Sequence, residues 1–94
     1  MEFEWDPAKD ESNLRKHGLS FATASLIFQG HVVTRPSYTR TFGEARPISI
    51  GEVAGLMMVT VVHTGRNGRV RIISARKARP KERAIYYGID PKET

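Results

Sequence analysis

The architecture of this chain follows most directly from residues 70–87, VRIISARKARPKERAIYY. The first half of this segment is rich in β-branched residues, which favours a strand. The second half carries clustered cations and then a short helical stretch, with Pro80 near its first turn, where proline is well tolerated. Because a core strand fixes the backbone, we expect the cations that follow it to be held in defined positions.

Asn67-Gly68, just before this strand, is a strong signal for a tight hairpin turn. The strand is therefore expected to pair with residues 56–63, a nearly continuous apolar run typical of a central strand. With a turn of two or four residues, regular alternation places Arg76 on the same face as His63 and Arg71 on the opposite face. A turn of three residues would exchange the pairing.

The N-terminal part predicts a short edge strand and two helices. Residues 3–5 alternate aromatic and acidic side chains, which suits a strand. Asp6-Pro7 marks a helix start, and the helix is expected to run to about His17, with Gly18 as its stop. Residues 20–30 predict a second short helix with a strong apolar face.

The middle of the chain predicts two more strands, at residues 31–35 and 46–50, separated by a polar, turn-rich stretch at 36–43. A turn is expected at residues 51–55, before the apolar run. A frayed tail is expected after Gly88.

Length and composition limit the possible classes of protein. The chain has 94 residues, and we interpret residues 1–94 as one small domain. It has no cysteine, and its three histidines lack metal-ligand spacing, so we expect no metal and no cofactor. A charged N-terminus and the lack of a long apolar run predict a soluble cytoplasmic protein that does not enter membranes.

The charge distribution indicates a polyanionic partner. The net charge is +5 and the isoelectric point about 10.0. Basic side chains crowd residues 66–83, whereas acids are concentrated at residues 2–11. This asymmetry favours nucleic acid or an acidic protein as partner, with a merely solvated basic face as the alternative.

The first predicted helix has few apolar residues, and its polar residues recur at helical spacing. Lys9, Asn13 and either Lys16 or His17 therefore share one face. For Asn13 we expect a structural role in which the amide satisfies backbone groups of neighbouring loops. For His17 an interaction with the helix dipole and a functional role are equally favoured.

Arg71 lies in the middle of a predicted strand and must either pair or face water, because an unpaired buried guanidinium is costly. Its possible carboxylate partners are Glu44, Glu52 and Glu82. Without a partner, Arg71 is a natural ligand for phosphate.

Five motifs spread over almost the whole chain resemble one protein family. In chain order they are Phe3-x-Trp5-Asp6-Pro7-x-Lys9, Asn13-x-x-Lys16-His17-Gly18-x-x-Phe21, Glu44-x-Arg46, Arg71-Ile72-Ile73-Ser74-Ala75-Arg76-Lys77-Ala78 and Glu82-Arg83-x-x-Tyr86. Together they resemble the BrnT toxin family. Gln29-Gly30-His31 and Pro47 depart from the family pattern, which affects the expected loop geometry more than the expected fold.

The resemblance implies an α+β, RelE-like fold, with two N-terminal helices packed on a twisted antiparallel sheet of about four strands and a short C-terminal helix. It also implies an mRNA-cleaving ribonuclease toxin of a type II toxin–antitoxin pair. The partners it implies are an RNA substrate, a BrnA-like antitoxin, and operator DNA bound by the joint complex, which represses its own operon.

Metal-free RNA cleavage needs a base for the 2′-hydroxyl, cations for the phosphorane and an acid for the leaving 5′-oxygen. We assign the catalytic roles to His63, Arg71, Arg76 and Glu44. The two arginines are the phosphate clamps, and His63 is the first candidate for proton transfer, with His17 as a further one. RNA binding is assigned to Lys9, Lys16, His17, Arg46, Lys77 and Arg79.

Structural interpretations stand beside these assignments. His63 at the end of a strand is about equally well explained by a hydrogen bond to the backbone. Glu44 and Arg46 share a face and are somewhat better explained by a salt bridge to Arg71. The alternative function is a non-catalytic module that binds nucleic acid or an antitoxin.

Overall fold

The computed structural model describes residues 1–36 and 46–88. Its elements in chain order are β1 (Glu2–Glu4), α1 (Pro7–His17), α2 (Phe21–Ala24), the 3-10 helix η1 (Ser25–Gln29), β2 (Val32–Arg35), β3 (Ile48–Val53), β4 (Met57–Arg66), β5 (Arg69–Lys77) and α3 (Pro80–Tyr86). The predictions for the turn-rich stretch at residues 36–43, for Glu44 and for the tail after Gly88 lie wholly or mainly outside the described residues.

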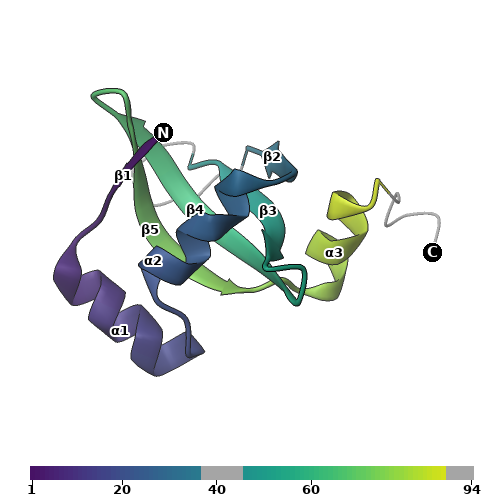
Figure 1. The fold of residues 1–94 in the computed structure, drawn as a ribbon, viewed down its shortest axis with the longest axis horizontal. Helices are drawn as coiled ribbons and strands as arrows, with labels where there is room; N and C mark the ends of the chain where they lie inside the picture. Colours follow the sequence, from purple (N-terminus) through teal and green to yellow (C-terminus); the bar gives the residue numbers. More distant parts are fainter. Residues whose placement is uncertain (37–45, 89–94) are drawn as a thin grey trace.

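Within the described residues, the strands form one five-stranded sheet with the order β1-β5-β4-β3-β2 (Figure 1). The pairs β2–β3, β3–β4 and β4–β5 are antiparallel, whereas β1 runs parallel to β5. The α+β class is confirmed, but the expected antiparallel sheet of about four strands is wrong in detail. The extra, parallel strand is the short N-terminal one, which pairs with the start of β5 before the chain turns into α1.

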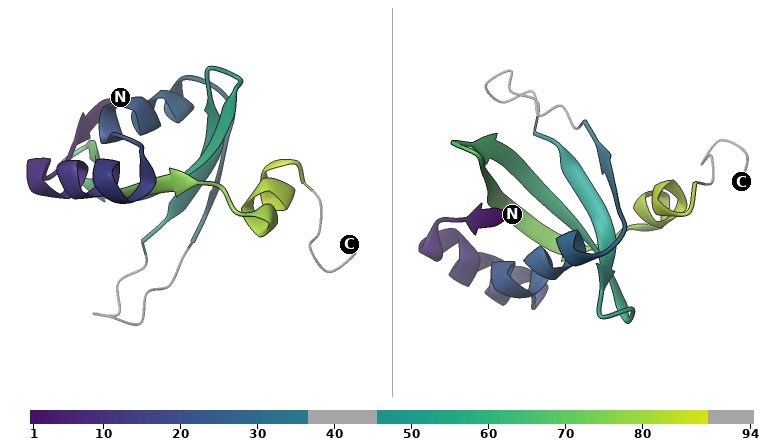
Figure 2. Two further views of the ribbon diagram at one scale, coloured as in Figure 1. Left: turned by 90° about the horizontal axis from the view of Figure 1, so that it is seen from below. Right: turned by 45° about the horizontal axis from the view of Figure 1, so that its top comes forward.

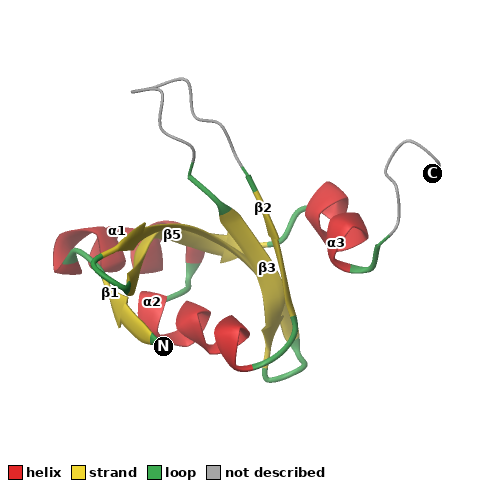
Figure 3. Cartoon of the chain, turned by 90° about the horizontal axis from the view of Figure 1, so that it is seen from above, coloured by secondary structure: helices red, strands yellow, loops and turns green. Residues whose placement is uncertain are grey.

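The helices lie on two sides of this sheet. Figures 2 and 3 show α1, α2 and η1 on one side and α3 on the other. The core lies between the sheet and the N-terminal helices, and its buried apolar residues include Phe21, Ala24, Ile27, Val59, Val61, Ile72 and Ala75. No helix of the described part of the chain is long and apolar enough to cross a membrane.

Local signals set the limits of α1 where the sequence predicts them. The Asp6 carboxylate accepts a hydrogen bond from the N–H of Ala8 at 2.8 Å, and Pro7 occupies the first turn. Gly18 adopts a left-handed φ of 69° and its N–H donates to the carbonyl of Leu14. The second helix differs in detail from the expectation, because it is one turn of α-helix (α2) that continues as the 3-10 helix η1.

The turn expected at residues 51–55 begins later, because β3 continues through Gly51 to Val53. A Cβ on Gly51 would lie 2.9 Å from the Cβ of Ile27. This glycine therefore allows η1 to approach the sheet and does not form a turn. The turn itself has positive φ angles at Ala54 and Gly55.

The hairpin between β4 and β5 has the two-residue turn that the sequence predicts. Asn67 and Gly68 have φ angles of 53° and 76°, as a type I′ turn requires, and Arg66 pairs with Arg69 across it. Regular pairing from this turn holds as far as His63, which lies opposite Ile72.

A β-bulge then interrupts the ladder. Val62 pairs with Ser74 while His63 pairs with Ile72, so Ile73 is an extra residue without an opposite partner. Because a bulge shifts side-chain alternation by one residue, the predicted parity is wrong for the part of β5 that follows Ile73.

Asn13 connects α1 to the outer edge of β5. Among the described residues, β1 pairs only with Arg69–Arg71, so the next part of this edge has no neighbouring strand. The Asn13 side chain takes that place: its Oδ1 accepts from the N–H of Ala75 at 3.1 Å, and its Nδ2 donates to the Ala75 carbonyl at 2.8 Å. Nδ2 also donates to the carbonyl of Leu19. The structural role predicted for Asn13 is confirmed.

Candidate functional site

The bulge brings Arg71 and Arg76 onto one face of the sheet. Arginines five positions apart on a regular strand point in opposite directions, but here Arg71 pairs with Thr64 and Arg76 with Thr60, which are both on the sheet face turned away from α1 and α2. We call this surface the arginine face and define it by Thr60, Val62, Thr64, Arg71, Ser74 and Arg76. The structure therefore puts on one face the two arginines that the sequence analysis assigns to phosphate.

Arg71 contacts a carboxylate loosely. Its Nη1 lies 3.8 Å from Oε2 of Glu4, and both side chains are a little over a quarter exposed, at 29% and 27%. This distance allows attraction but is too long for a hydrogen bond. The partner comes from β1 and is none of the three carboxylates considered from sequence. The side chain thus remains able to donate to a second anion.

Arg76 makes a tight, bidentate ion pair with Glu82 of α3. Its two terminal nitrogens lie 2.5 Å and 2.8 Å from the carboxylate oxygens of Glu82. The same carboxylate accepts from the N–H of Arg79 at 2.7 Å and so caps α3. Burial alone would raise the pKa of Glu82, but the hydrogen bonds from Arg76 and Arg79 outweigh it and lower that pKa below its usual value. One glutamate therefore holds both α3 and the guanidinium of Arg76.

His63 lies on the other side of the sheet, under the N-terminal helices. Its Nε2 is 2.7 Å from the hydroxyl of Ser49, which is itself 2.8 Å from the hydroxyl of Thr34. The edge-to-face contact with Phe28 has a centroid distance of 5.5 Å. The structure does not bring His63 together with the two arginines, contrary to the face expected from regular alternation.

The burial of His63 predicts a pH dependence of stability. Burial lowers the pKa of His63 from its usual value of 6.5, so the unfolded chain binds this proton more readily than the folded chain. The stabilising contribution is therefore fully present above pH 6.5 and is lost as the pH falls through 6.5 toward the lower folded pKa. We expect urea denaturation at about pH 7.5 and about pH 5.5 to show a larger loss for the wild type than for His63→Gln. Equal losses in the two proteins would contradict this assignment.

A cavity of about 220 Å³ lies between α1 and β5, and we call it the α1–β5 cavity. It is lined by Lys9, Ser12, Asn13, Lys16, His17, Ile73 and Ser74. The structure thus brings together the three α1 residues that the sequence analysis assigns to RNA binding. Ser74 also belongs to the arginine face, so the cavity and that face adjoin at the bulge.

The other predicted residues are more scattered. Arg46 lies two residues before the start of β3 and is half-buried. Lys77 pairs with Val59 and so lies on the helix-covered face, at the exposed end of β5. Arg79 is the exposed N-cap of α3. Within residues 1–36 and 46–88, no group of three or more histidine, aspartate or glutamate side chains is placed to hold a metal ion.

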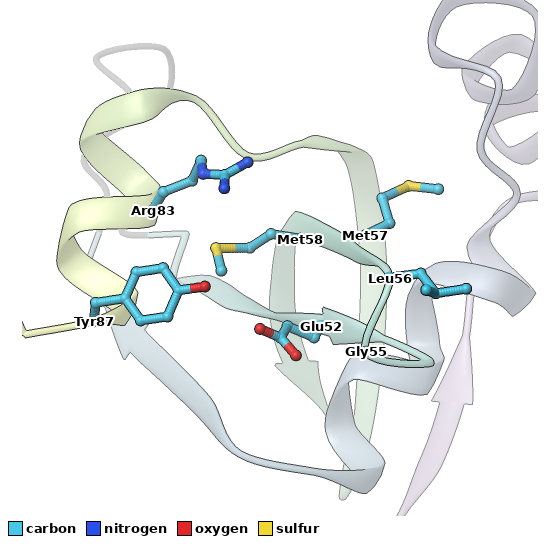
Figure 4. Close-up of a pocket in the computed structure, with 7 residues that line it drawn as sticks. All are labelled: Glu52, Gly55, Leu56, Met57, Met58, Arg83 and Tyr87. Carbon is cyan, nitrogen blue, oxygen red and sulfur yellow. The ribbon is translucent and has the colours of Figure 1, made fainter.

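Sequence reasoning missed a second pocket of about 180 Å³ between α3 and the β3–β4 turn. Figure 4 shows the Met58 side chain pointing between Arg83 and Tyr87 of the C-terminal segment, with Glu52 facing the same space. Leu56 on its rim is 91% exposed and Tyr87 is 58% exposed. The exposed leucine beside a turn was the available signal, but the sequence analysis placed it within a buried strand.

Comparison with known proteins identifies the family of this chain. A sequence profile described as "Ribonuclease toxin, BrnT, of type II toxin-antitoxin system" matches residues 5–82. The chain belongs to the BrnT family. The matched part of the chain includes Lys9 and His17 of the α1–β5 cavity and the two arginines of the arginine face. BrnT proteins are ribonuclease toxins that act with an antitoxin.

A solved BrnT structure is similar in fold. The chain is 28% identical to the Brucella abortus ribonuclease toxin BrnT, with a TM-score of 0.62 over 84% of this chain and 97% of that one. No curated protein sequence matches the chain. The family that the five motifs resemble is thereby confirmed.

Proposed function

We propose that this BrnT-family chain is a metal-independent endoribonuclease that cleaves mRNA on the arginine face. The observation that carries the proposal is the bulge at Ile73, because it puts Arg71 and Arg76 on the same face of the sheet. Two guanidinium groups held by a sheet are suited to bind a phosphodiester and to stabilise the additional charge of its transition state.

The carboxylate partners of the arginines leave room for this role. An arginine has five N–H donors, and Arg76 uses one on each terminal nitrogen for Glu82. Three N–H groups of Arg76 therefore remain to bind a phosphate, while Glu82 keeps the guanidinium oriented. Glu4 holds Arg71 only loosely, so a phosphate competes with a weak partner.

Proton transfer in the proposal belongs to His17 and Glu44. A base takes the proton of the 2′-hydroxyl, the 2′-oxygen attacks phosphorus, and an acid protonates the leaving 5′-oxygen. His17 is suited to this role because it lines a cavity that adjoins the arginine face at Ser74. His63 is the weaker candidate, because the sheet separates it from the arginines.

The proposal is tested by incubating the purified protein with single-stranded RNA in EDTA. We expect cleavage products that carry a 2′,3′-cyclic phosphate, and we expect them to disappear with the folded double variant Arg71→Ala/Arg76→Ala. If products form only when divalent metal is restored, metal independence is wrong. A parallel reaction with ribosomes present identifies cleavage that needs the ribosome.

One observation favours the second candidate, a non-catalytic binding module. Both arginines already contact carboxylates, as they would if their role were to hold β1 and α3 in place. RNA binding with a steep salt dependence and no cleavage products in any of these reactions would favour that function.

The proposed partner in the cell is a BrnA-like antitoxin, and the joint complex is proposed to bind operator DNA and repress its operon. The net charge of +5 and the exposed Leu56 and Tyr87 beside Arg83 support contact with an acidic protein segment that carries an apolar side chain. Gel-shift experiments with operator DNA and the complex test this proposal. A complex that neither suppresses RNA cleavage nor shifts the DNA would refute it.

A further inference from the structure

The α1–β5 cavity has the chemistry of an anion site. Two lysines, a histidine and two serine hydroxyls line it, and no carboxylate does. The acids of the same helix are engaged elsewhere: Asp10 accepts from the N–H of Phe21, and Glu11 pairs with Arg15. Among the described residues, neither Lys9 nor Lys16 has a carboxylate within 4 Å. Within residues 1–36 and 46–88, therefore, no carboxylate neutralises the positive charge of the cavity.

The backbone on both sides of the α1–β5 cavity is held in place by contacts within the protein. Two hydrogen bonds between the buried Asn13 and Ala75 hold α1 against the edge of β5, and a third ties α1 to the carbonyl of Leu19. The bulge at Ile73 sets the direction of Ser74 on the other wall. The side chains of Lys9, Lys16 and His17 are themselves exposed, so these contacts fix the position of the helix that carries them.

The size and position of the cavity suit a phosphate group of a nucleic-acid strand. A volume of about 220 Å³ is enough for a phosphodiester group with some of its hydration. Ser74 precedes Arg76 by two residues, which is roughly 7 Å along a strand. A nucleic-acid strand with one phosphate at Arg76 can therefore also reach the cavity.

We propose that the α1–β5 cavity binds a backbone phosphate of single-stranded RNA, neighbouring the phosphate held on the arginine face. Lys9 and Lys16 supply charge and Ser74 donates a hydrogen bond, whereas His17, in the same cavity, keeps its proposed role in proton transfer at the neighbouring phosphate. The choice of RNA as the source of the phosphate rests on the proposed function. Binding at this cavity extends the RNA contact from the sheet onto α1.

The histidines of the chain provide an internal control for the test. His17 lines the cavity, His31 makes a tilted ring contact with Tyr86 of α3, and His63 lies beneath the N-terminal helices. In NMR spectra of the imidazole rings, a 2′-O-methyl RNA oligonucleotide, which binds but is not cleaved, is expected to shift the His17 signals and leave those of His63 in place. Inorganic phosphate alone is expected to shift His17 only at much higher concentration.

Charge-matched variants measure the affinity. Lys9→Gln/Lys16→Gln is expected to bind this oligonucleotide about tenfold more weakly and to lower the salt slope by about 0.7, the value for one phosphate on a single strand. The control Arg15→Gln/Lys81→Gln removes the same charge from exposed positions outside the cavity and is expected to change affinity less than twofold.

Equal weakening in the two double variants, or an unchanged His17 signal, would overturn the cavity as a binding site. A His17 response to inorganic phosphate without one to RNA would overturn RNA as its ligand. The test is separate from catalysis, because the oligonucleotide cannot be cleaved. His17 shifts in a protein that cuts no natural RNA would support the cavity and refute the proposed ribonuclease activity.

Discussion

Replacing Arg76 with alanine is expected to slow RNA cleavage about 10²- to 10³-fold, the usual effect of removing one preorganised charge donor from a phosphate or oxyanion site. Arg76 is preorganised because Glu82 binds it through both terminal nitrogens and is itself fixed by the N–H of Arg79. Lysine at this position keeps the charge but not the bidentate geometry, so Arg76→Lys should recover only part of the rate.

The matched variant is Glu82→Gln, which removes the charge of the other partner in the ion pair. If Arg76 acts on phosphate, this variant keeps the guanidinium and should lose less than about tenfold, because only the orientation of Arg76 is affected. Single-turnover cleavage measures the rate, and circular dichroism confirms that each protein is folded at the assay temperature. Equal losses for Arg76→Ala and Glu82→Gln would mean that the pair serves only to dock α3, and Arg76 would leave the proposed site.

Replacing Asn13 with alanine is expected to lower the free energy of unfolding by about 3–5 kcal/mol, from roughly 1–1.7 kcal/mol for each of three backbone groups left without its partner. Those groups are the N–H and carbonyl of Ala75 and the carbonyl of Leu19. In a domain of this length such a loss corresponds to a melting temperature lower by roughly 15–25 °C. No other single polar side chain in the described structure connects a helix to the sheet edge in this way.

Ser12→Ala is the neighbouring control, since Ser12 is exposed on the same turn of α1 and is expected to change stability by less than about 0.5 kcal/mol. Thermal unfolding followed by circular dichroism gives both values. If Asn13→Ala melts within about 3 °C of the wild type, water replaces the amide at the edge of β5 and the proposed rigidity of the α1–β5 cavity is lost.

Helix ends and turns that depend on residues close together in the chain were predictable from the sequence. Asp6 and Gly18 limit α1 through hydrogen bonds within a few residues of themselves, and Asn67-Gly68 needs only its own φ angles to form the turn. Membership of the BrnT family was likewise accessible, because its motifs lie in chain order over most of the sequence. The role of Asn13 followed from the same kind of argument, since a buried amide must find backbone partners.

The bulge was not predicted, because the burial that requires it is seen only in the structure. Burial of both Ile72 and Ala75, three residues apart, requires one extra residue between them if both are to face the helices. The same extra residue lets Arg71 and Arg76 both avoid the core. Regular alternation, applied without this condition, placed Arg76 beside His63.

The sequence alone therefore determined the order of the helices and strands, the tight turn before β5, the excess of positive charge and the protein family. These properties depend on residue type and on contacts between close neighbours in the chain. Only the tertiary structure decided that Arg71 and Arg76 share a face, that His63 lies on the other face, and that Lys9, Lys16 and His17 surround one cavity with Ser74. Such groupings depend on strand register and on helix docking, and one inserted residue in a strand reverses every side chain that follows it.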